Sequence, residues 1–155
     1  MLQVLDRYGT LRSGARGLGL GDGAASLAEA IGAQGASVTA AVGLTDDLSG
    51  FDFLFSLCIM DALAGDAAGR AILEGAMECL RPGGLAVHIL PYAPDSRRLL
   101  GRAFNRAGLE RAALGLVSRG HQVARLKPAP GRRALADPSG IVPFGLVVRR
   151  AATLL

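Results

Sequence analysis

The chain has 155 residues, half of them hydrophobic, which suits one domain with a substantial core and excludes a disordered chain. Its formal net charge of +4 combines two unequal halves. Residues 1–80 carry ten acids and four arginines, whereas residues 81–155 carry three acids and thirteen basic residues. This division predicts an acidic surface and a basic one, and so a contact with a substrate or with a second subunit.

The apolar segments and the cysteines indicate in which cellular compartment the protein resides. The longest uncharged run, residues 30–45, is too short and too rich in glycine for a membrane span. The first residues lack the basic-then-apolar order of a signal peptide. Cys58 and Cys79 are isolated and have no metal-ligand spacing, so we expect buried thiols in a reducing environment. The sequence therefore predicts a cytoplasmic protein without a metal site and without a membrane contact.

Helical and strand-like segments alternate along the first half. The expected elements, in chain order, are a short helix or arm within 1–14, an apolar segment at 15–21, a helix at 24–31 and strands at 37–42 and 51–60. The segment at 24–31 is rich in helix-forming residues, four of them alanine, and the run at 51–60 is almost continuously apolar, as in a strand buried on both faces.

The second half repeats this alternation. The expected elements are a helix at 66–80, a turn at 81–84, a strand at 85–90, a helix from an N-cap at Asp95 to a stop at Gly108, and strands at 122–126 and 144–148. Strands that alternate with helices over this length predict one α/β domain, residues 1–155, around a mainly parallel sheet.

Glycines alternate with other residues between Gly17 and Gly23, just before the first long helix. Glycine lets the backbone turn sharply and approach a ligand, and the helix that follows offers free N–H groups. The dinucleotide spacing GxGxxG is met only in its relaxed form, from Gly19 to Ala24. The segment therefore predicts either a ligand-binding turn or a simple tight turn.

Three strings in order resemble the class I S-adenosylmethionine-dependent methyltransferases. Residues 17–23 (GLGLGDG) are similar to the family's first motif, residues 51–63 (FDFLFSLCIMDAL) to its fourth-strand motif, and residues 80–88 (LRPGGLAVH) to its turn into strand five. The resemblance covers residues 15 to about 150. It implies a Rossmann-like three-layer α/β sandwich whose mostly parallel sheet ends in a C-terminal antiparallel hairpin.

The resemblance also implies a site. Gly19, Gly21 and Gly23 would cradle the methionine part of S-adenosylmethionine, and Asp46 or Asp47 would contact the adenine amine. Further residues implied at the cofactor are Ser56, Leu57 and Cys58, while Asp61 would border the substrate. Tyr92 follows the strand at 85–90, so it would either border the substrate as well or simply pack in the core.

Two acids typical of the family are absent. Gly17 stands where an acid helps to hold the amino end of the cofactor, and Val42 stands where an acid accepts the ribose hydroxyls. Losing such a charge-assisted contact costs about 1.5–3 kcal/mol. The function is therefore either methyl transfer to a small molecule or, alternatively, a non-catalytic methyltransferase-like subunit that stabilises a partner protein.

The link between the second and third strands is short. Only residues 43–50 lie where the family has a helix, a strand and another helix, so we expect the fold to lack one strand and its flanking helices. The second strand should then be an edge, with apolar surface left for a homo-oligomeric or hetero-oligomeric contact. The arginine pairs suit a solvated face or such a partner better than nucleic acid, because the chain has few aromatic residues for stacking.

Overall fold

The computed structural model describes residues 1–57, 66–93, 103–124 and 140–152. Its elements are α1 (Leu2–Arg7), β1 (Arg16–Leu20), α2 (Ala24–Gly32), β2 (Ser37–Ala41), β3 (Phe51–Leu57), α3 (Asp66–Cys79), β4 (Leu80–Tyr92), α4 (Arg106–Ser118), β5 (Gln122–Val123) and β6 (Val142–Arg149). The predicted alternation of strands and helices is confirmed, and the segment before the domain is the short helix α1.

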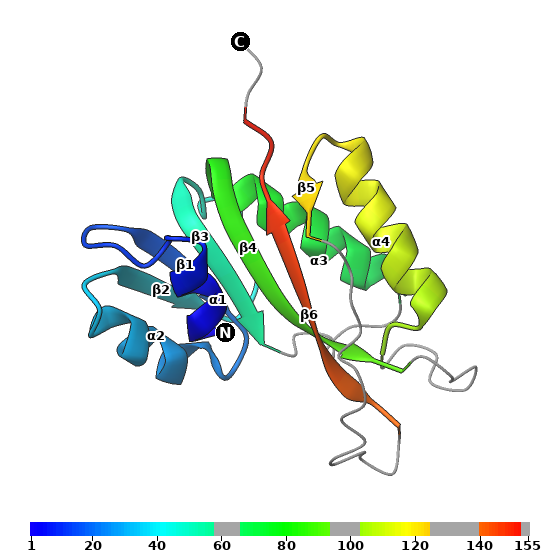
Figure 1. Ribbon diagram of the computed structural model, residues 1–155, viewed down its shortest axis with the longest axis horizontal. Coiled ribbons are helices and arrows are strands. Elements are labelled where there is room, and N and C mark those ends of the chain that lie inside the picture. The colour runs from blue at the N-terminus through cyan, green and yellow to red at the C-terminus, as the bar shows by residue number, and fades with distance from the viewer. Residues whose placement is uncertain (58–65, 94–102, 125–139, 153–155) are drawn as a thin grey trace.

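One six-stranded sheet has the order β2-β1-β3-β4-β6-β5 (Figure 1). β2, β1, β3 and β4 are parallel, whereas β6 is antiparallel to both β4 and β5. The mostly parallel sheet with a C-terminal antiparallel hairpin is thus confirmed. β2 forms one edge of the sheet, as the short link after it predicts.

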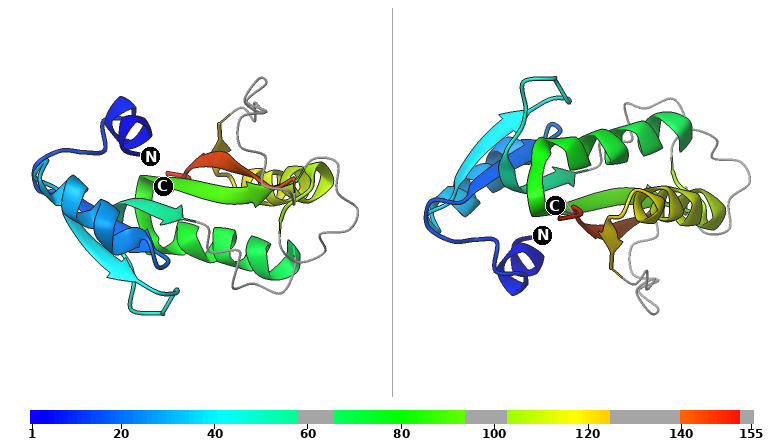
Figure 2. Two further views of the ribbon diagram at one scale, coloured as in Figure 1. Left: turned by 90° about the horizontal axis from the view of Figure 1, so that it is seen from below. Right: turned by 90° about the horizontal axis from the view of Figure 1, so that it is seen from above.

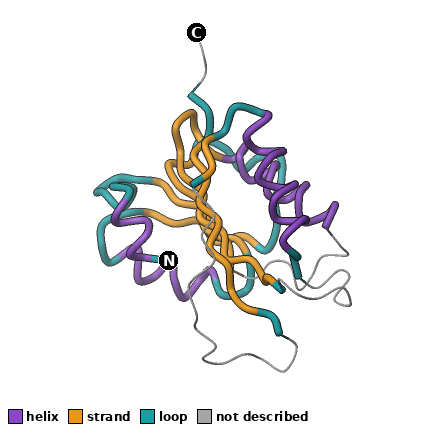
Figure 3. The backbone as a smooth tube through the Cα atoms, turned by 45° about the vertical axis from the view of Figure 1, so that its right-hand side comes forward, coloured by secondary structure: helices purple, strands orange, loops and turns teal. Residues whose placement is uncertain are grey.

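Helices cover both faces of the twisted sheet (Figures 2 and 3). α3 and α4 lie on one face, where Leu73, Met77 and Leu116 join Leu54 and other strand residues in a buried cluster. On the opposite face, α1 and α2 pack against a second cluster built around Phe53 and Phe55. The continuous apolar run of β3 follows from this arrangement, because its side chains enter both clusters in turn.

Residues 81–84, which the sequence predicts to be a turn before a strand, do not form a separate turn. Residues 81–84 lie within β4, where the register with β3 shifts: Leu80 pairs with Phe51, but Leu85 pairs with Phe53. Gly83 has φ +76° in this irregular stretch. The string RPGG therefore forms a bulge inside a long strand, because glycine adopts the backbone conformation that the extra residues require.

The prediction of a helix from Asp95 to a stop at Gly108 is wrong for residues 103–108, the part that the structure describes. Residues 103–105 are not helical, α4 begins at Arg106, and residues 95–102 lie outside the described residues. The side chain of Asn105 caps α4 by accepting a hydrogen bond of 2.7 Å from Gly108 N. Gly108 is thus in the first turn of the helix, and the buried stripe that holds α4 follows it, including Leu109 and Leu116.

The link of residues 43–50 crosses the end of β1 and returns to β3. Leu44 and Leu48 are partly buried against the α3 cluster, and a Cβ at Gly75 of α3 would lie 2.9 Å from Leu44 Cδ1. The link therefore covers some of the surface that the sequence predicts to be bare. Val42 is still 84% exposed at the sheet edge.

The unequal charge of the two halves is partly compensated within the domain. Three arginines of the second half pair with acids of the first half, namely Arg81 with Asp52 at 2.7 Å, Arg119 with Glu74 at 2.7 Å and Arg150 with Glu78 at 3.2 Å. These arginines are partly or largely exposed, so each pair stabilises the fold by at most about 1 kcal/mol. The first pair joins β4 to β3, the second joins the end of α4 to α3, and the third joins the end of β6 to α3.

Candidate cofactor site

The carboxyl ends of β1, β2 and β3 meet at one edge of the sheet. Leu20, the last residue of β1, pairs with Ala41 of β2 and with Ser56 of β3. In open sheets of this type, ligands bind outside the carboxyl ends of parallel strands, where neighbouring connections leave the sheet on opposite faces. The strand order places such a point between β1, which leads to α2, and β3, which leads to the α3 face.

The turn from β1 into α2 lies at this edge. Gly21 has φ +97°, a conformation that glycine adopts readily, and its N–H donates to the carbonyl oxygen of Ala41 at 3.1 Å. Gly23 is the N-cap of α2 and supplies no side-chain cap. N–H groups in the first turn of this helix therefore point towards the edge, where an anion such as the cofactor's carboxylate is favoured.

Gly17 and Gly19 lie inside β1 instead of in the turn. A Cβ at Gly17 would lie 2.3 Å from Phe53 Cε2, and a Cβ at Gly19 would lie 2.6 Å from Phe55 Cζ. The rings of β3 therefore occupy the space that side chains at these positions would need. A side chain at Gly17 would therefore clash with Phe53, and a contact between Gly19 and a cofactor stays a prediction.

Val42 lies at the part of the edge that is expected to hold the ribose. Val42 follows β2 with its side chain in solvent, and an aliphatic side chain accepts no hydrogen bond from a diol. Asp46 is exposed on the link after β2, and Thr45 Oγ1 donates to Asp47 Oδ1 at 2.5 Å. Hydrogen bonds from Thr45 and from its own backbone lower the pKa of Asp47. The glycine turn thus fits the methionine end, whereas the ribose end has no matching side chain at Val42.

Ser56 and His88 form a buried pair that the sequence does not reveal. Ser56 Oγ and His88 Nδ1 lie 2.8 Å apart, and both residues are almost fully buried. Burial lowers the pKa of His88 to about 4, so the imidazole is neutral at pH 7. Within the described residues, His88 Nε2 has no hydrogen-bond partner. The two residues occupy paired positions of β3 and β4, a register that only the folded sheet determines.

The other predicted site residues fall in different surroundings. Leu57 lies beside the turn, because a Cβ at Gly23 would be 3.3 Å from Leu57 Cδ1. Tyr92, predicted at the substrate border, is buried at the end of β4, where its ring centroid lies 5.4 Å from that of Phe144. Cys58 and Asp61 lie outside the described residues. The structure therefore brings Gly21, Gly23 and Leu57 together, and places Ser56 in the adjoining core.

Among residues 1–57, 66–93, 103–124 and 140–152, no group of three or more His, Cys, Asp or Glu side chains could hold a metal ion. Within the same ranges, each helix falls short of the length and apolar character that crossing a membrane requires.

No protein-family model matches the sequence, and no curated protein is significantly similar to it. Solved structures, in contrast, match over nearly the whole chain. A provisionally assigned sarcosine dimethylglycine methyltransferase from Galdieria sulphuraria has a TM-score of 0.66 at 13% identity, with 97% of this chain and 83% of that chain covered. CalS10, an amino pentose methyltransferase from Micromonospora echinaspora with S-adenosylmethionine bound, has a TM-score of 0.61 at 18% identity, with 97% and 89% covered.

A third similar structure is an S-adenosylmethionine-dependent O-methyltransferase from Thermotoga maritima. Its TM-score is 0.56 at 17% identity, and the match covers 99% of this chain and 64% of that chain. The TM-scores of these matches establish the fold, whereas the low sequence identities leave the substrate open. The strand order, the turn at the end of β1 and these likenesses lead to one conclusion: this chain has the fold of the class I S-adenosylmethionine-dependent methyltransferases.

Proposed function

We propose that this chain binds S-adenosylmethionine at the carboxyl edge of β1 and β3 and transfers its methyl group to a small molecule. The observation that carries the proposal is the turn from Gly21 to Gly23. It combines a left-handed backbone conformation with the uncapped N-terminus of α2, at the point of the sheet where such folds bind ligands.

The chain's own residues would act mainly by positioning. The turn would hold the carboxylate of the methionine part, Leu57 would give an apolar wall, and Asp46 would accept a hydrogen bond from the adenine amine. The bound cofactor would supply an already activated methyl group. Little acid or base chemistry is then needed, and holding the acceptor in line with the breaking bond can account for most of the rate.

Calorimetry with S-adenosylmethionine and with its demethylated product tests this function. Because Val42 offers no ribose acceptor, we expect Val42→Glu to tighten the binding of both compounds by about ten- to a hundredfold. Val117→Glu is the matched control, since Val117 is 51% exposed on α4. Failure of both the natural chain and Val42→Glu to bind either compound at millimolar concentration would contradict the proposal.

A second variant tests the turn itself. We expect Gly23→Val to weaken cofactor binding at least tenfold, because a branched side chain would fill the space beside Leu57 and the first turn of α2. Gly32→Ala at the other end of α2 is the control, since a Cβ there has no atom within 4 Å. Equal affinities of Gly23→Val and the natural chain would place the cofactor elsewhere.

The free edge of β2 supports a second element of this proposal, an oligomer. Another chain, of the same or of a different sequence, would pair with β2 and cover Val42. The side chains of β2, at positions 37–41, are uncharged, whereas strands at exposed edges usually carry charges or proline to prevent such pairing. The buried free thiol of Cys79 agrees with a reducing compartment, which we propose to be the cytoplasm.

A further inference from the structure

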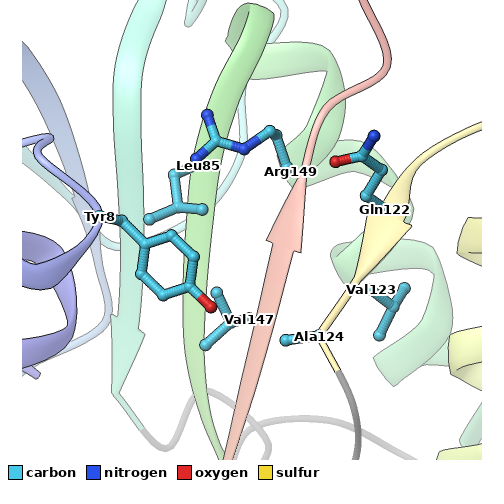
Figure 4. A pocket seen from close by; sticks show the side chains of 7 residues that line it. All are labelled: Tyr8, Leu85, Gln122, Val123, Ala124, Val147 and Arg149. Atoms are coloured by element: carbon cyan, nitrogen blue, oxygen red, sulfur yellow. The ribbon is translucent and has the colours of Figure 1, made fainter.

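A groove crosses the α1 face of the sheet far from the carboxyl edge (Figure 4). Its volume is about 200 Å³, and its lining includes Leu85 of β4, Val147 and Arg149 of β6, and Gln122 of β5. Tyr8, which follows α1, forms the opposite wall and is 41% exposed. Leu85 and Val147 form an apolar floor of the groove, and Tyr8, Gln122 and Arg149 add polar groups to its lining.

Strand register explains why these side chains converge. Leu85 pairs with Arg149, and Arg149 pairs with Gln122, so the three residues stand side by side on neighbouring strands and face the same side of the sheet. Figure 4 shows the guanidinium group of Arg149 extending over Leu85 towards the side where Tyr8 lies. The groove thus has a cationic end directly beside its apolar floor.

A second cavity, of about 590 Å³, lies next to these residues. It shares Gln122 and Arg149 with the groove and adds Gly83, Arg119 and Arg150 to the lining. Alone, the groove is smaller than the range of about 300–1,000 Å³ that is usual for small-molecule sites. Together with the adjoining cavity, it offers enough space for a small organic molecule.

Charge compensation differs among the three arginines. Arg119 pairs with Glu74, and Arg150 pairs with Glu78. The described contact of Arg149 is a hydrogen bond of 3.0 Å from Nη1 to the carbonyl oxygen of Gly83, which carries no charge. A guanidinium stays protonated at any physiological pH and has five N–H donors. Arg149 therefore lines both cavities with a charge that no acid among the described residues pairs with, and it has spare donors.

We propose that this groove binds a small organic anion. The apolar body of the ligand would lie on Leu85 and Val147 beside the ring of Tyr8, and its carboxylate or phosphate would be bound by Arg149. Guanidinium groups bind both kinds of anion through paired hydrogen bonds. Leu85 in the groove is level with Gly17, the second residue of β1, and lies two strands away from it. The cofactor is proposed at the opposite end of β1, so the two ligands are separate.

Four probes test the proposal by calorimetry. Three share an eight-carbon chain, and the fourth shares only the phosphate group. Octanoate and octyl phosphate combine an apolar body with an anion, octanol lacks the charge, and inorganic phosphate lacks the apolar body. We expect one of the two amphipathic anions to bind about ten- to a hundredfold more tightly than octanol or inorganic phosphate. The tighter of the two identifies the natural head group as a carboxylate or a phosphate. The chain has no tryptophan and only two tyrosines, Tyr8 and Tyr92, so a change in tyrosine fluorescence that is lost in Tyr8→Leu gives an independent readout.

Arg149→Gln should remove this preference, leaving octanoate or octyl phosphate no tighter than octanol. Arg106→Gln is the matched control, because Arg106 is an exposed arginine of α4 that pairs with Glu110 at 2.9 Å. Arg149→Lys keeps the charge and should keep at least part of the preference, which covers the case in which the glutamine variant does not fold. Tyr8→Leu should change the affinities for octanol and octanoate in parallel.

The proposal would be overturned by either of two results. One is that both amphipathic anions bind no more tightly than octanol. The other is that Arg106→Gln weakens their binding as much as Arg149→Gln does. Neither result depends on S-adenosylmethionine, so the proposal for the groove and the proposal for the cofactor site are tested separately.

Discussion

Ser56 Oγ and His88 Nδ1 lie 2.8 Å apart in the interior of the sheet, joining β3 to β4 through side chains as well as through the backbone. The pair stands one strand away from the end of β1, because Ser56 also pairs with Leu20. It therefore links the core of the domain to the edge at which we place the cofactor.

Removing one member of this pair should destabilise the fold. Ser56→Ala leaves His88 Nδ1 buried without its partner, so we expect the free energy of unfolding to fall by about 1–3 kcal/mol. The double variant Ser56→Ala/His88→Leu removes both polar groups, and we expect it to be less destabilised than the two single variants added together. Urea unfolding measures all three. Strict additivity would show that the hydrogen bond contributes nothing.

Stability should fall as the solution is acidified from pH 6.5 to about pH 4. His88 has a pKa of about 4 in the folded chain because of its burial, against an ordinary value of 6.5. Between these values the unfolded chain binds a proton that the folded chain does not bind. The free energy of unfolding therefore decreases by about 1.4 kcal/mol for each pH unit lost in this window. Urea unfolding at pH 7, 6 and 5 measures the slope.

His88→Leu is the variant that assigns this slope. This variant should remove most of the pH dependence of the free energy of unfolding between pH 6.5 and 4. His121→Asn should leave the part of that dependence that comes from His88 unchanged. His121 is the appropriate control, because its pKa is also lowered, by burial first and then by Arg150. An unchanged slope in His88→Leu would assign the pH dependence to other groups.

Adding a methyl group at Gly17 should destabilise the domain through overpacking. Because the added Cβ would lie 2.3 Å from the ring of Phe53, we expect Gly17→Ala to lower the free energy of unfolding by about 1–3 kcal/mol. Combining it with Phe53→Leu should recover part of this loss. Gly32→Ala, with open space around the new Cβ, is the control in the same urea titration. A neutral Gly17→Ala would mean that the ring moves aside at no cost.

The chain should be larger than a monomer in light scattering at micromolar concentration if β2 is paired as proposed. Thr39, in the middle of β2, is exposed, and Thr39→Lys would place a charge on the free edge and should shift the species towards the monomer. Ser26→Lys on the exposed side of α2 is the control. A strictly monomeric natural chain would contradict the proposal.

The sequence by itself determined the fold class of this protein. The apolar run of residues 51–57, the glycines before α2 and the alternation of strands with helices reflect local preferences and burial on two faces, which composition and periodicity reveal directly. Together with the family resemblance, the eight residues after Val42 also predict the edge position of β2, because the family has a further strand where this short link lies. The helix after Asn105 was missed because Gly108 resembles a stop, whereas the cap and the buried stripe permit it in the first turn.

Only the tertiary structure decided which residues stand side by side. The pairing of Ser56 with His88, the packing of Phe53 on Gly17 and the convergence of Leu85, Arg149 and Gln122 all depend on the register of strands far apart in the chain. Register is set by the global fit of two apolar faces, and no local preference encodes it. For the same reason, the motif residues indicated a cofactor edge, while the groove at Arg149 became visible only when the sheet was assembled.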